Sequence, residues 1–552
     1  MRLMFLDPPA RPARSSTTFV ITASLWLAVI GNLALWQSLM KLPDIAGVRG
    51  AVFMLALAFM IACAVTAVLS LVAWRYTLKP AIALLLLLAG FATYYMLMYG
   101  IVVDTPMLIN VLQTDVREAR DQISWQLLAC VIFIAGLPLL WLWRQPLAVA
   151  SWQRQMGHNL GLLIGALLLL IGTTQLVFQD FASLMRNHTE LRYKINPLNS
   201  VYAVLDLTVI PSDQPRGPLQ ALGEDAHIVP RALDTPKRPP LLVFVLGETA
   251  RSQNFSLNGY TRNTNPQLAK EHITSFTHVS SCGTSTAESV PCMFSHLGRE
   301  GFNQRSHEFE NLLDVLQHAG YAVLWMDNQS GCKDQCLRVA NVNTSDLKLP
   351  EYCDSGECRD TVMLARIDAE IAKLPAERRA RGTVVVVHQM GSHGPAYFKR
   401  SPAPFKHFTP ECTDTSLSPC SREQVINAYD NTLVFTDHFL SRVIGWLKTQ
   451  ESHHTPAMLY VSDHGESLGE KNMYLHGLPY SVAPPEQTTV PLITWLSPGF
   501  EQVSRVNTRC LQSQRNKPLS HDNLFHSVLG LMSVKTQVYQ RELDLFAACE
   551  GR

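Results

Sequence analysis

The segment SSCGTSTAESVPCMFS, residues 280–295, concentrates side chains that could do chemistry. It places seven hydroxyl residues between and beside two cysteines. A metal ion can lower the pKa of a hydroxyl until it attacks phosphorus at neutral pH, and the amide groups at a helix start can hold phosphate oxygens. The hydroxyls could instead only cap and hydrogen-bond a turn. Spacing alone does not choose a nucleophile among four of them: Ser281, Thr284, Ser285 and Thr286.

Candidate metal ligands lie far from this segment in the chain. Glu248 follows one apolar run, and Asp463 and His464 follow another. His393 lies at the end of the run TVVVVHQMGSHGP, and His476 lies in the segment YLHGLPY. Carboxylate oxygen combined with imidazole nitrogen suits zinc better than magnesium or calcium, which prefer oxygen ligands only. Taken singly, Glu248 could simply favour a helix start, and the DHG sequence could be an ordinary turn. Their common position after apolar runs is what makes them candidates for one cluster.

The elements that must position these residues are short apolar runs after residue 240, separated by helical stretches. The runs are LLVFVLGET, YAVLWMDNQ, TVVVVHQMGSHGP, AMLYVSDHGES and PLITWLSPG. Continuous Val, Ile and Leu runs that end in polar residues predict buried strands of a mainly parallel sheet between helices, an α/β fold. Ligands of such sheets bind beyond the carboxyl ends of the strands. That edge would carry Glu248, the segments 327–333 and 388–393, Asp463 and His464.

The first third of the chain has a different composition. Only 18 of the 91 charged residues fall within the first 180 positions, whereas 16 of the 18 histidines follow position 200. Apolar runs at about 19–40, 51–74, 81–103, 125–143 and 160–178 are each long enough to cross a bilayer as a helix, so we expect five spans. The first run is too long for a cleaved signal peptide and lacks a small-residue cleavage site, so we expect a retained anchor.

Basic residues predict the orientation of these spans. Arg and Lys lie before the first run, between the second and third, and between the fourth and fifth, which places those segments and the N-terminus in the cytoplasm. Everything after residue 178 then lies outside, where ten cysteines occur. We expect neighbours to form disulfides there. The pairs would be 282 with 292, 332 with 336, 353 with 358, 412 with 420 and 510 with 549, with metal binding by Cys332 and Cys336 as the alternative.

Three parts follow from these patterns. Residues 1–180 form a transmembrane domain with five helices, 181–239 a linker with an amphipathic or bridging helix, and 240–552 the catalytic domain. The net charge of +1 comes with no concentrated basic stretch, which excludes nucleic acid as a partner.

Four blocks carry a family resemblance: GETARSQNFSLNGYTRNTNP, SSCGTSTAESVPCMFS, VSDHGESLGE and YLHGLPY. With five spans ahead of them, they resemble the phosphoethanolamine transferases that modify lipid A, including the plasmid-borne enzymes of polymyxin resistance. The likeness runs from about residue 25 to the end. It implies a catalytic domain of the alkaline-phosphatase and sulfatase type with one tightly bound zinc, and a second zinc is conceivable. The implied zinc site consists of Glu248, Thr286, Asp463 and His464, with Thr286 as the nucleophile.

The resemblance also implies the substrates and the location. Phosphatidylethanolamine would be the donor, diacylglycerol the released product and a lipid A phosphate the acceptor, in a monomeric multi-pass protein of the bacterial inner membrane with a periplasmic catalytic domain. This activity would confer resistance to polymyxin and cationic peptides. Some relatives have Asn where this chain has Gln329. Positions matching the substrate contacts are Asn110, Thr114, Glu118, Ser330, Lys333, His393, Glu466 and His476.

Other functions remain open at this point. The acceptor could be a core sugar or another surface glycan, and a membrane-anchored phosphohydrolase could share the fold. A sulfatase would need a Cys-x-Pro-x-Arg setting, which the sequence after Cys282 lacks. Phosphoglycerol transferases also combine five spans with a related domain. A receptor without catalysis would leave the nucleophile and metal residues unexplained.

Overall fold

The structure is a computed structural model of the 552-residue chain. It describes residues 12–45, 47–114, 119–120, 122–208, 218–229, 238–344, 349–354, 357–415, 417 and 419–551. The chain divides into two units. The membrane unit comprises residues 1–105 and 123–210, and the catalytic unit comprises 106–122 and 211–552.

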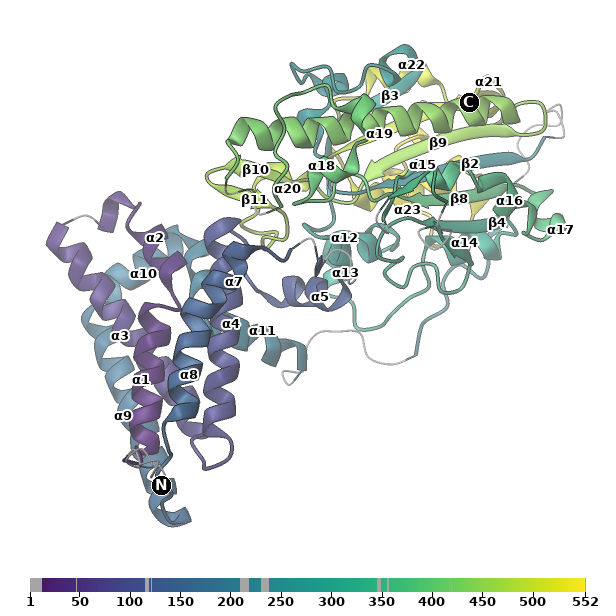
Figure 1. Cartoon of the computed structure of the whole chain (residues 1–552). Helices are drawn as coiled ribbons and strands as arrows, with labels where there is room; N and C mark the ends of the chain where they lie inside the picture. Colours follow the sequence, from purple (N-terminus) through teal and green to yellow (C-terminus); the bar gives the residue numbers. More distant parts are fainter. Residues whose placement is uncertain are drawn as a thin grey trace, which may run out of the picture. The chain divides into compact units, whose positions relative to one another are not determined.

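The membrane unit is helical (Figure 1). Four helical stretches are long and apolar enough to cross a membrane, and a fifth is added if the bent pair α1 and α2 counts as one span. These elements are α1 (Ser16–Val29), α2 (Leu33–Leu39), α3 (Gly47–Leu71), α4 (Leu78–Met98), the continuous α7 (Trp125–Val131), π-helix (Ile132–Gly136) and α8 (Leu137–Arg144), and α9 (Trp152–Leu176). Three shorter helices follow: α10 (Phe178–Asn187), the 3-10 helix Thr189–Lys194, and α11 (Leu198–Thr208).

The first expected span is two helices that meet at an angle of 43° rather than one straight helix. A break inside a bilayer is tolerated only where the released backbone groups find partners. Here Gly31 O accepts hydrogen bonds from Thr93 Oγ1 at 2.8 Å and from Asn196 Nδ2 at 3.0 Å. Asn32 Nδ2 donates to Leu27 O at 2.9 Å. Uncharged polar side chains therefore supply hydrogen bonds to the backbone carbonyl groups at the bend.

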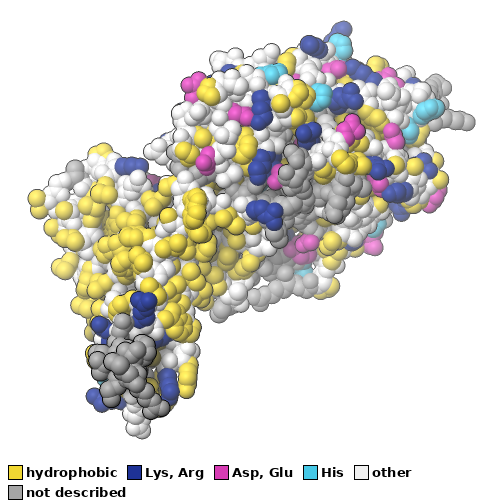
Figure 2. All heavy atoms as spheres, viewed as in Figure 1, with side chains coloured by type: hydrophobic (Ala, Val, Ile, Leu, Met, Phe, Trp, Pro, Cys, Tyr) yellow, Lys and Arg dark blue, Asp and Glu magenta, His cyan; other side chains and the backbone are white. Residues whose placement is uncertain are grey.

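The outer surface of the membrane unit is apolar. Figure 2 shows a broad yellow surface over these helices, with few charged side chains. Large side chains of α9 are exposed on it, among them Leu160, Ile164, Leu168 and Ile171. A surface of this kind is stable in lipid and not in water, which agrees with the expected transmembrane role.

The catalytic unit is built on an eight-stranded mixed sheet. The strands lie in the order β13 (Leu519–Ser520), β3 (Ile273–Ser280), β12 (Thr489–Leu496), β9 (Thr455–Ser462), β2 (Pro240–Gly247), β8 (Thr383–His388), β4 (Ala322–Asp327) and β5 (Ala340–Asn343). The run from β9 to β5 is parallel, as expected, but β12 is antiparallel to both of its neighbours.

The direction of β12 follows from its connection. The segment between β9 and β12 contains the hairpin of β10 (Ser467–Glu470) and β11 (Met473–Leu475), followed by α20 (Pro485–Thr488). No long crossover helix carries the chain back to the opposite edge, so β12 starts where β9 ended and runs the other way. An apolar run such as TVPLITWL does not reveal this direction.

Helices cover both faces of the sheet. Leu242, Phe244 and Leu246 of β2 pack into a core with side chains of α14 (Leu312–His318) and α23 (Leu524–Leu531). The alternate residues Val243 and Val245 point to the other face, because side chains alternate along a strand. The long helix α19 (Arg422–Gln450) lies along that face and contacts β9 (Figure 1).

Shorter elements complete the catalytic unit. They are α5 (Thr105–Gln113), β1 (His227–Ile228), α12 (Thr286–Met293), α13 (Gly298–Asn303), β6 (Cys353–Asp354), β7 (Glu357–Cys358), α15 (Thr361–Leu364), α16 (Ile367–Ala372), α17 (Ala376–Arg379), α18 (Tyr397–Arg400), α21 (Pro498–Ser504), α22 (Thr508–Ser513) and β14 (Val534–Lys535). The unit boundary cuts α5 after its first residue.

Five disulfides connect the ten cysteines of the catalytic unit, and all five pairings are those expected from chain proximity. The Cys332–Cys336 bond excludes the alternative of a metal site at those two residues. The two remaining cysteines, Cys63 and Cys130, are free thiols in membrane helices. Disulfides of this number are typical of an oxidising compartment.

Candidate functional site

The site begins where two neighbouring parallel strands end. Leu246 of β2 pairs with Val461 of β9, and Gly247 pairs with Ser462. The residues that follow, Glu248 on one strand and Asp463 with His464 on the other, therefore emerge side by side. All three side chains are buried, and their ligand atoms lie within 4.8 Å of one another. We call Glu248, Asp463 and His464 the triad.

Backbone contacts fix the orientation of the triad. Asp463 Oδ1 accepts from the amides of Thr249 at 3.1 Å and His464 at 2.7 Å. His464 Nδ1 lies 2.9 Å from Gly465 O, so this nitrogen carries the proton and donates. The other ring nitrogen, Nε2, lies 3.4 Å from both a Glu248 oxygen and Asp463 Oδ2. Three ligand atoms thus converge on one point.

The charges of the triad fit a cation. Burial raises the pKa of Asp463 to about 7, and the Glu248 carboxylate adds to the rise. Burial acts to raise the pKa of Glu248, but hydrogen bonding and charge from His464 hold it well below its usual range. Burial opposes a charged His464, yet the two carboxylates raise its pKa to about 10. Two buried carboxylates therefore demand a positive charge between them.

A buried oxygen atom with no hydrogen-bond partner supports a metal ion as the source of this positive charge. Asp463 Oδ2 is buried and has no hydrogen-bond partner among the described residues. Buried polar atoms are rarely left in this state unless water or an ion completes them. Two carboxylates and one imidazole nitrogen match the ligands that zinc takes in proteins. The triad thus fits the metal that the sequence analysis expects.

Thr286 lies at the first position of α12, directly after the N-cap residue Ser285. Its Oγ1 is 3.0 Å from Glu248 Oε2 and 3.5 Å from His464 Nε2. The side chain is only 4% exposed. A hydroxyl held against the triad at the start of a helix is placed both to contact a bound metal and to meet phosphate oxygens at the helix amides.

The other hydroxyls of the segment 280–295 have different roles in the structure. Ser281 Oγ donates to Gly283 O, and Thr284 Oγ1 donates to Leu478 O, both at 2.6 Å. Ser289 Oγ donates to Asp463 O at 2.6 Å, which ties α12 to the end of β9. The disulfide Cys282–Cys292 closes the segment. The capping interpretation therefore applies to several hydroxyls of the segment, while Thr286 contacts the triad.

Gln329 is a site residue whose role the sequence did not reveal. Its Nε2 donates to Glu248 Oε2 at 3.0 Å, the same oxygen that Thr286 contacts. Asp327 lies at the end of β4. Its carboxylate accepts hydrogen bonds from the backbone N–H of Gln329 at 2.9 Å and from His388 Nδ1 at 3.0 Å. Two signals were available: Gln329 lies in the segment 327–333 that follows a strand-like run, and some relatives have Asn at this position.

A second group of residues lies beside the triad. The rings of His464 and His476 are 4.3 Å apart between centroids, and those of His476 and His393 are 5.6 Å apart. Glu466 Oε1 is 3.1 Å from His476 Nδ1, and Glu466 Oε2 accepts from the Tyr397 hydroxyl at 2.9 Å. Burial raises the pKa of Glu466 to about 8. These residues come together from three segments of the chain, around His393 and Tyr397, Asp463 to Glu466, and His476.

A positive charge, Lys333, lies in the segment between β4 and β5. Lys333 Nζ donates to Ser330 Oγ at 2.9 Å and to Gln113 O, at the end of α5, at 3.5 Å. Thr114 follows that residue and donates to Asn110 O at 2.8 Å. Of the eight predicted substrate-contacting residues, Lys333 therefore lies near three others, Ser330, Asn110 and Thr114. Another of the eight, Glu118, lies outside the described residues.

Family models match both units of the chain. The sulfatase family matches residues 240–534, and the family described as phosphoethanolamine transferase EptA/EptB matches residues 61–209. The first match covers the sheet and the triad, and the second covers most of the membrane unit.

Individual relatives match over nearly the whole chain. The phosphoethanolamine transferase EptA of Escherichia coli K12 is 36% identical over 546 residues, covering 98% of both chains. The phosphatidylethanolamine transferase Mcr-1 from Escherichia coli is 36% identical over 532 residues, covering 94% of this chain and 96% of its own. The solved structure of the integral membrane protein lipooligosaccharide phosphoethanolamine transferase A (EptA) from Neisseria meningitidis aligns with a TM-score of 0.91 at 33% identity, over 98% of this chain and 100% of its own.

Proposed function

This chain belongs to the EptA family of phosphoethanolamine transferases, and from that premise we propose that Thr286 carries the transferred group between donor and acceptor. The protein transfers phosphoethanolamine to lipid A, the activity of a family that includes enzymes of polymyxin resistance. The observation that carries the proposal is the contact of Thr286 Oγ1 with both Glu248 and His464 at the start of α12.

The first half-reaction takes the group from phosphatidylethanolamine. The Thr286 oxygen attacks the phosphorus of the donor, a bond forms between them, and the bond from phosphorus to the glycerol oxygen breaks. Diacylglycerol leaves with a proton on that oxygen. The enzyme retains phosphoethanolamine as an ester of Thr286.

The second half-reaction transfers the group onward. A phosphate oxygen of lipid A attacks the same phosphorus, and the Thr286 oxygen leaves and regains its proton. Donor and acceptor are both bulky amphiphiles, so using one site in turn avoids holding them together. If water attacked in place of the acceptor, the phosphoethanolamine ester of Thr286 would be hydrolysed slowly. Phosphohydrolase activity is therefore expected as a side reaction of the transferase.

Glu248, Asp463, His464 and Thr286 would hold the zinc ion of this site. A zinc ion bound there lowers the pKa of a coordinated hydroxyl and offsets negative charge on the phosphoryl oxygens. The chain itself supplies the orientation. Gln329 holds the Glu248 oxygen next to Thr286, and Ser289 anchors α12 to β9.

The remaining polar residues suit the two substrates. Lys333 presents a positive charge that attracts a phosphate, with Ser330 bound to it. We assign Asn110, Thr114 and Glu118 to the donor headgroup, because the first two lie by the α5 terminus that Lys333 contacts. Glu466 orients His476, which with His393 can donate a proton to the departing glycerol oxygen or hold a second zinc.

We also propose the arrangement in the cell. Residues 1–180 form the transmembrane domain, 181–239 the linker and 240–552 the catalytic domain of a monomeric inner-membrane protein. The N-terminus would be cytoplasmic and the catalytic domain periplasmic. The uneven distribution of Lys and Arg and the five disulfides support this orientation.

The test is mass spectrometry of lipid A from Gram-negative cells that express the parent protein, Thr286→Ala or the control Thr284→Val. We expect lipid A with added phosphoethanolamine for the parent and for Thr284→Val, and none for Thr286→Ala. Unmodified lipid A in all three, with folded protein in the membrane, would refute lipid A as acceptor and favour a core sugar or another glycan. Modified lipid A with Thr286→Ala would refute the nucleophile.

A further inference from the structure

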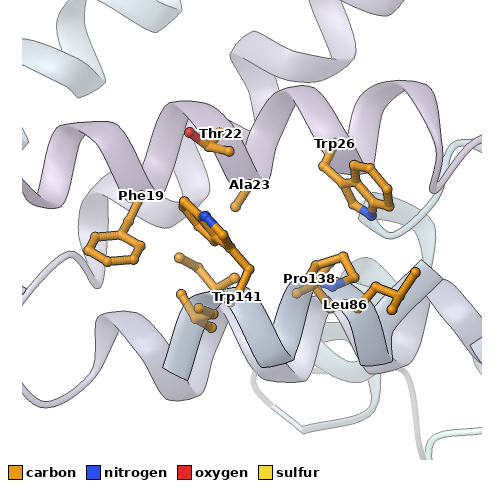
Figure 3. Close-up of a pocket in the computed structure, with 10 residues that line it drawn as sticks. Phe19, Thr22, Ala23, Trp26, Leu86, Pro138 and Trp141 are labelled. Atoms are coloured by element: carbon orange, nitrogen blue, oxygen red, sulfur yellow. The ribbon is translucent and has the colours of Figure 1, made fainter. Parts of the chain in front are cut away.

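A cavity of about 330 Å³ lies among the helices of the membrane unit. It is bounded by α1, α4 and α8, and its wall is almost entirely apolar (Figure 3). We call it the α1–α4–α8 groove. Residues that line it include Phe19, Ala23, Trp26, Leu86, Pro138 and Trp141. In a spanning bundle, an apolar space of this kind is filled by hydrocarbon rather than water.

A hydrogen bond keeps one wall of the groove in place. Pro138 has no backbone N–H, so it cannot donate to the carbonyl of Ile134, four residues earlier in the helix. The indole Nε1 of Trp26 donates to Ile134 O at 2.9 Å instead. The Trp26 ring is therefore tied across the groove, from α1 to the π-helix that precedes α8, and this contact holds the ring in place beside the space.

Cations lie at one end of the groove. Lys79 Nζ is 5.6 Å from the ring centroid of Phe19, and the Arg14 guanidinium is 5.5 Å from the ring centroid of Trp141. Both rings line the groove, so both cations lie at its rim. Arg14 is exposed, and Lys79 is half-buried.

Among the described residues, the same end of the membrane unit is basic. The segments 12–20, 70–82 and 139–160 contain four Arg and one Lys, and they contain no Asp or Glu. Figure 2 shows dark blue side chains at the lower end of the yellow surface. This concentration favours an anionic partner and disfavours one that also carries an ammonium group.

We propose that the α1–α4–α8 groove binds one acyl chain of an anionic glycerophospholipid, whose phosphate contacts Arg14 and Lys79. The apolar wall accepts the chain, and the two cations select the headgroup. This lipid differs from the donor of the transfer reaction, because its recognition depends on a negative net charge. The inference is independent of the reaction at Thr286.

The test is native mass spectrometry of the full-length protein in mild detergent with equal amounts of phosphatidylglycerol and phosphatidylethanolamine. The parent protein is expected to retain one phosphatidylglycerol, in about 30-fold preference over phosphatidylethanolamine, the ratio given by about 1 kcal/mol for each of the two basic residues near the headgroup. Equal retention of the two lipids, or retention of neither, would overturn the proposal.

Two variants separate a groove lipid from lipid on the outer surface. Ala23→Phe fills the groove and is expected to abolish the retained lipid. The control Leu25→Phe changes the same helix at a residue that is 51% exposed and is expected to keep it. Equal retention by both variants would refute binding in the groove.

A third variant covers the case that Ala23→Phe fails to fold. Arg14→Gln combined with Lys79→Gln alters only side chains at the rim and is expected to make retention of the two phospholipids equal. An unchanged preference for phosphatidylglycerol in this double variant would show that Arg14 and Lys79 do not select the headgroup.

Discussion

The membrane unit and the catalytic unit both bury polar side chains, but of different kinds. In the described spanning helices the buried polar side chains are uncharged: Ser16, Ser24, Ser70, Thr93, Gln155 and Asn159. Several of them bond backbone carbonyls, as Thr93 does at Gly31 and Gln155 at Ala73. The end of the sheet in the catalytic unit instead buries Glu248, Asp463, His464 and Glu466 almost completely.

The buried polar side chains of the membrane unit contribute to stability, whereas those of the catalytic unit contribute to chemistry. A neutral side chain that satisfies a buried carbonyl stabilises the fold at low electrostatic cost. Buried carboxylates that crowd together destabilise it unless a cation binds, so their presence indicates a functional site. We therefore expect substitutions in the two units to affect different measurements.

The largest expected effect is on activity in the catalytic unit. Glu248→Gln removes a negative charge while keeping the shape, and we expect transfer to fall at least about 1,000-fold because a metal ligand and the contact to Thr286 are impaired. The melting temperature of the metal-free protein is expected to stay equal or rise, since a buried charge is lost. Assays of lipid A modification and thermal melting check both. A large loss of stability would contradict the comparison.

The next effect is on stability in the membrane unit. Asn196 is fully buried, and its Nδ2 donates to Gly31 O, Ala89 O and Thr93 Oγ1. Asn196→Ala leaves these groups less satisfied and is expected to cost about 2 kcal/mol. Transfer per folded molecule is expected to remain unchanged.

Thermal melting of detergent-purified protein measures this loss. Ser200→Ala is the matched control, because Ser200 is equally buried and its hydroxyl has no partner among the described residues. A similar melting temperature for both variants would show that the Asn196 hydrogen bonds contribute little.

A smaller effect is expected at Gln329. Gln329→Ala removes the hydrogen bond that holds Glu248 Oε2, and we expect kcat to fall about tenfold, as is typical when a partner of a metal ligand is lost. Zinc affinity should fall with it, whereas KM for the donor should change little. Gln329→Asn keeps an amide donor and should recover part of the activity. Loss of donor binding with full kcat would assign Gln329 to the substrate instead.

The smallest expected effect depends on pH. Burial lowers the pKa of His521 to about 3, and its ring nitrogens contact Ser462 O and the Cys282 amide. The unfolded chain binds a proton on this side chain below its ordinary pKa of about 6.5, while the folded protein does not. Stability is therefore complete above about pH 6.5 and declines as the pH falls toward 3.

We expect this decline to amount to about 1 kcal/mol between pH 7 and pH 5.5 from His521 alone. Melting curves of the parent and of His521→Gln across this range measure it. The variant should be less stable at pH 7 but less sensitive to acid. Parallel pH profiles would indicate that other groups dominate the acid sensitivity.

Much of this architecture could be predicted from the sequence. Apolar runs ending in polar residues located five of the eight strands of the sheet, β2, β4, β8, β9 and β12, but not β3, β5 or β13. Chain proximity predicted all five disulfides. The antiparallel direction of β12 could not be predicted, because strand direction depends on the connection and not on the run itself. The bend at Gly31 and Asn32 was hidden inside an apolar run, and the partner that completes it, Asn196, is distant in sequence.

The site divides in the same way. The rule that ligands bind at strand ends pointed to Glu248, Asp463 and His464, which the structure brings together. The contact between Gln329 and Glu248 depends on side-chain geometry across two strands, which no local pattern encodes. Spacing could not choose among the hydroxyls of the segment 280–295, whereas in the structure Thr286 is distinguished by its position at the start of α12 and by its contacts with Glu248 and His464.

The most direct test of the proposed mechanism is to trap the group on the enzyme. The full-length protein would be incubated with phosphatidylethanolamine in the absence of lipid A, digested and analysed by tandem mass spectrometry. The account predicts that the peptide containing Thr286 gains the mass of one phosphoethanolamine group, located on Thr286, and that later addition of lipid A removes it. A group located on another residue, or transfer to lipid A with no modified peptide at any time, would contradict the account.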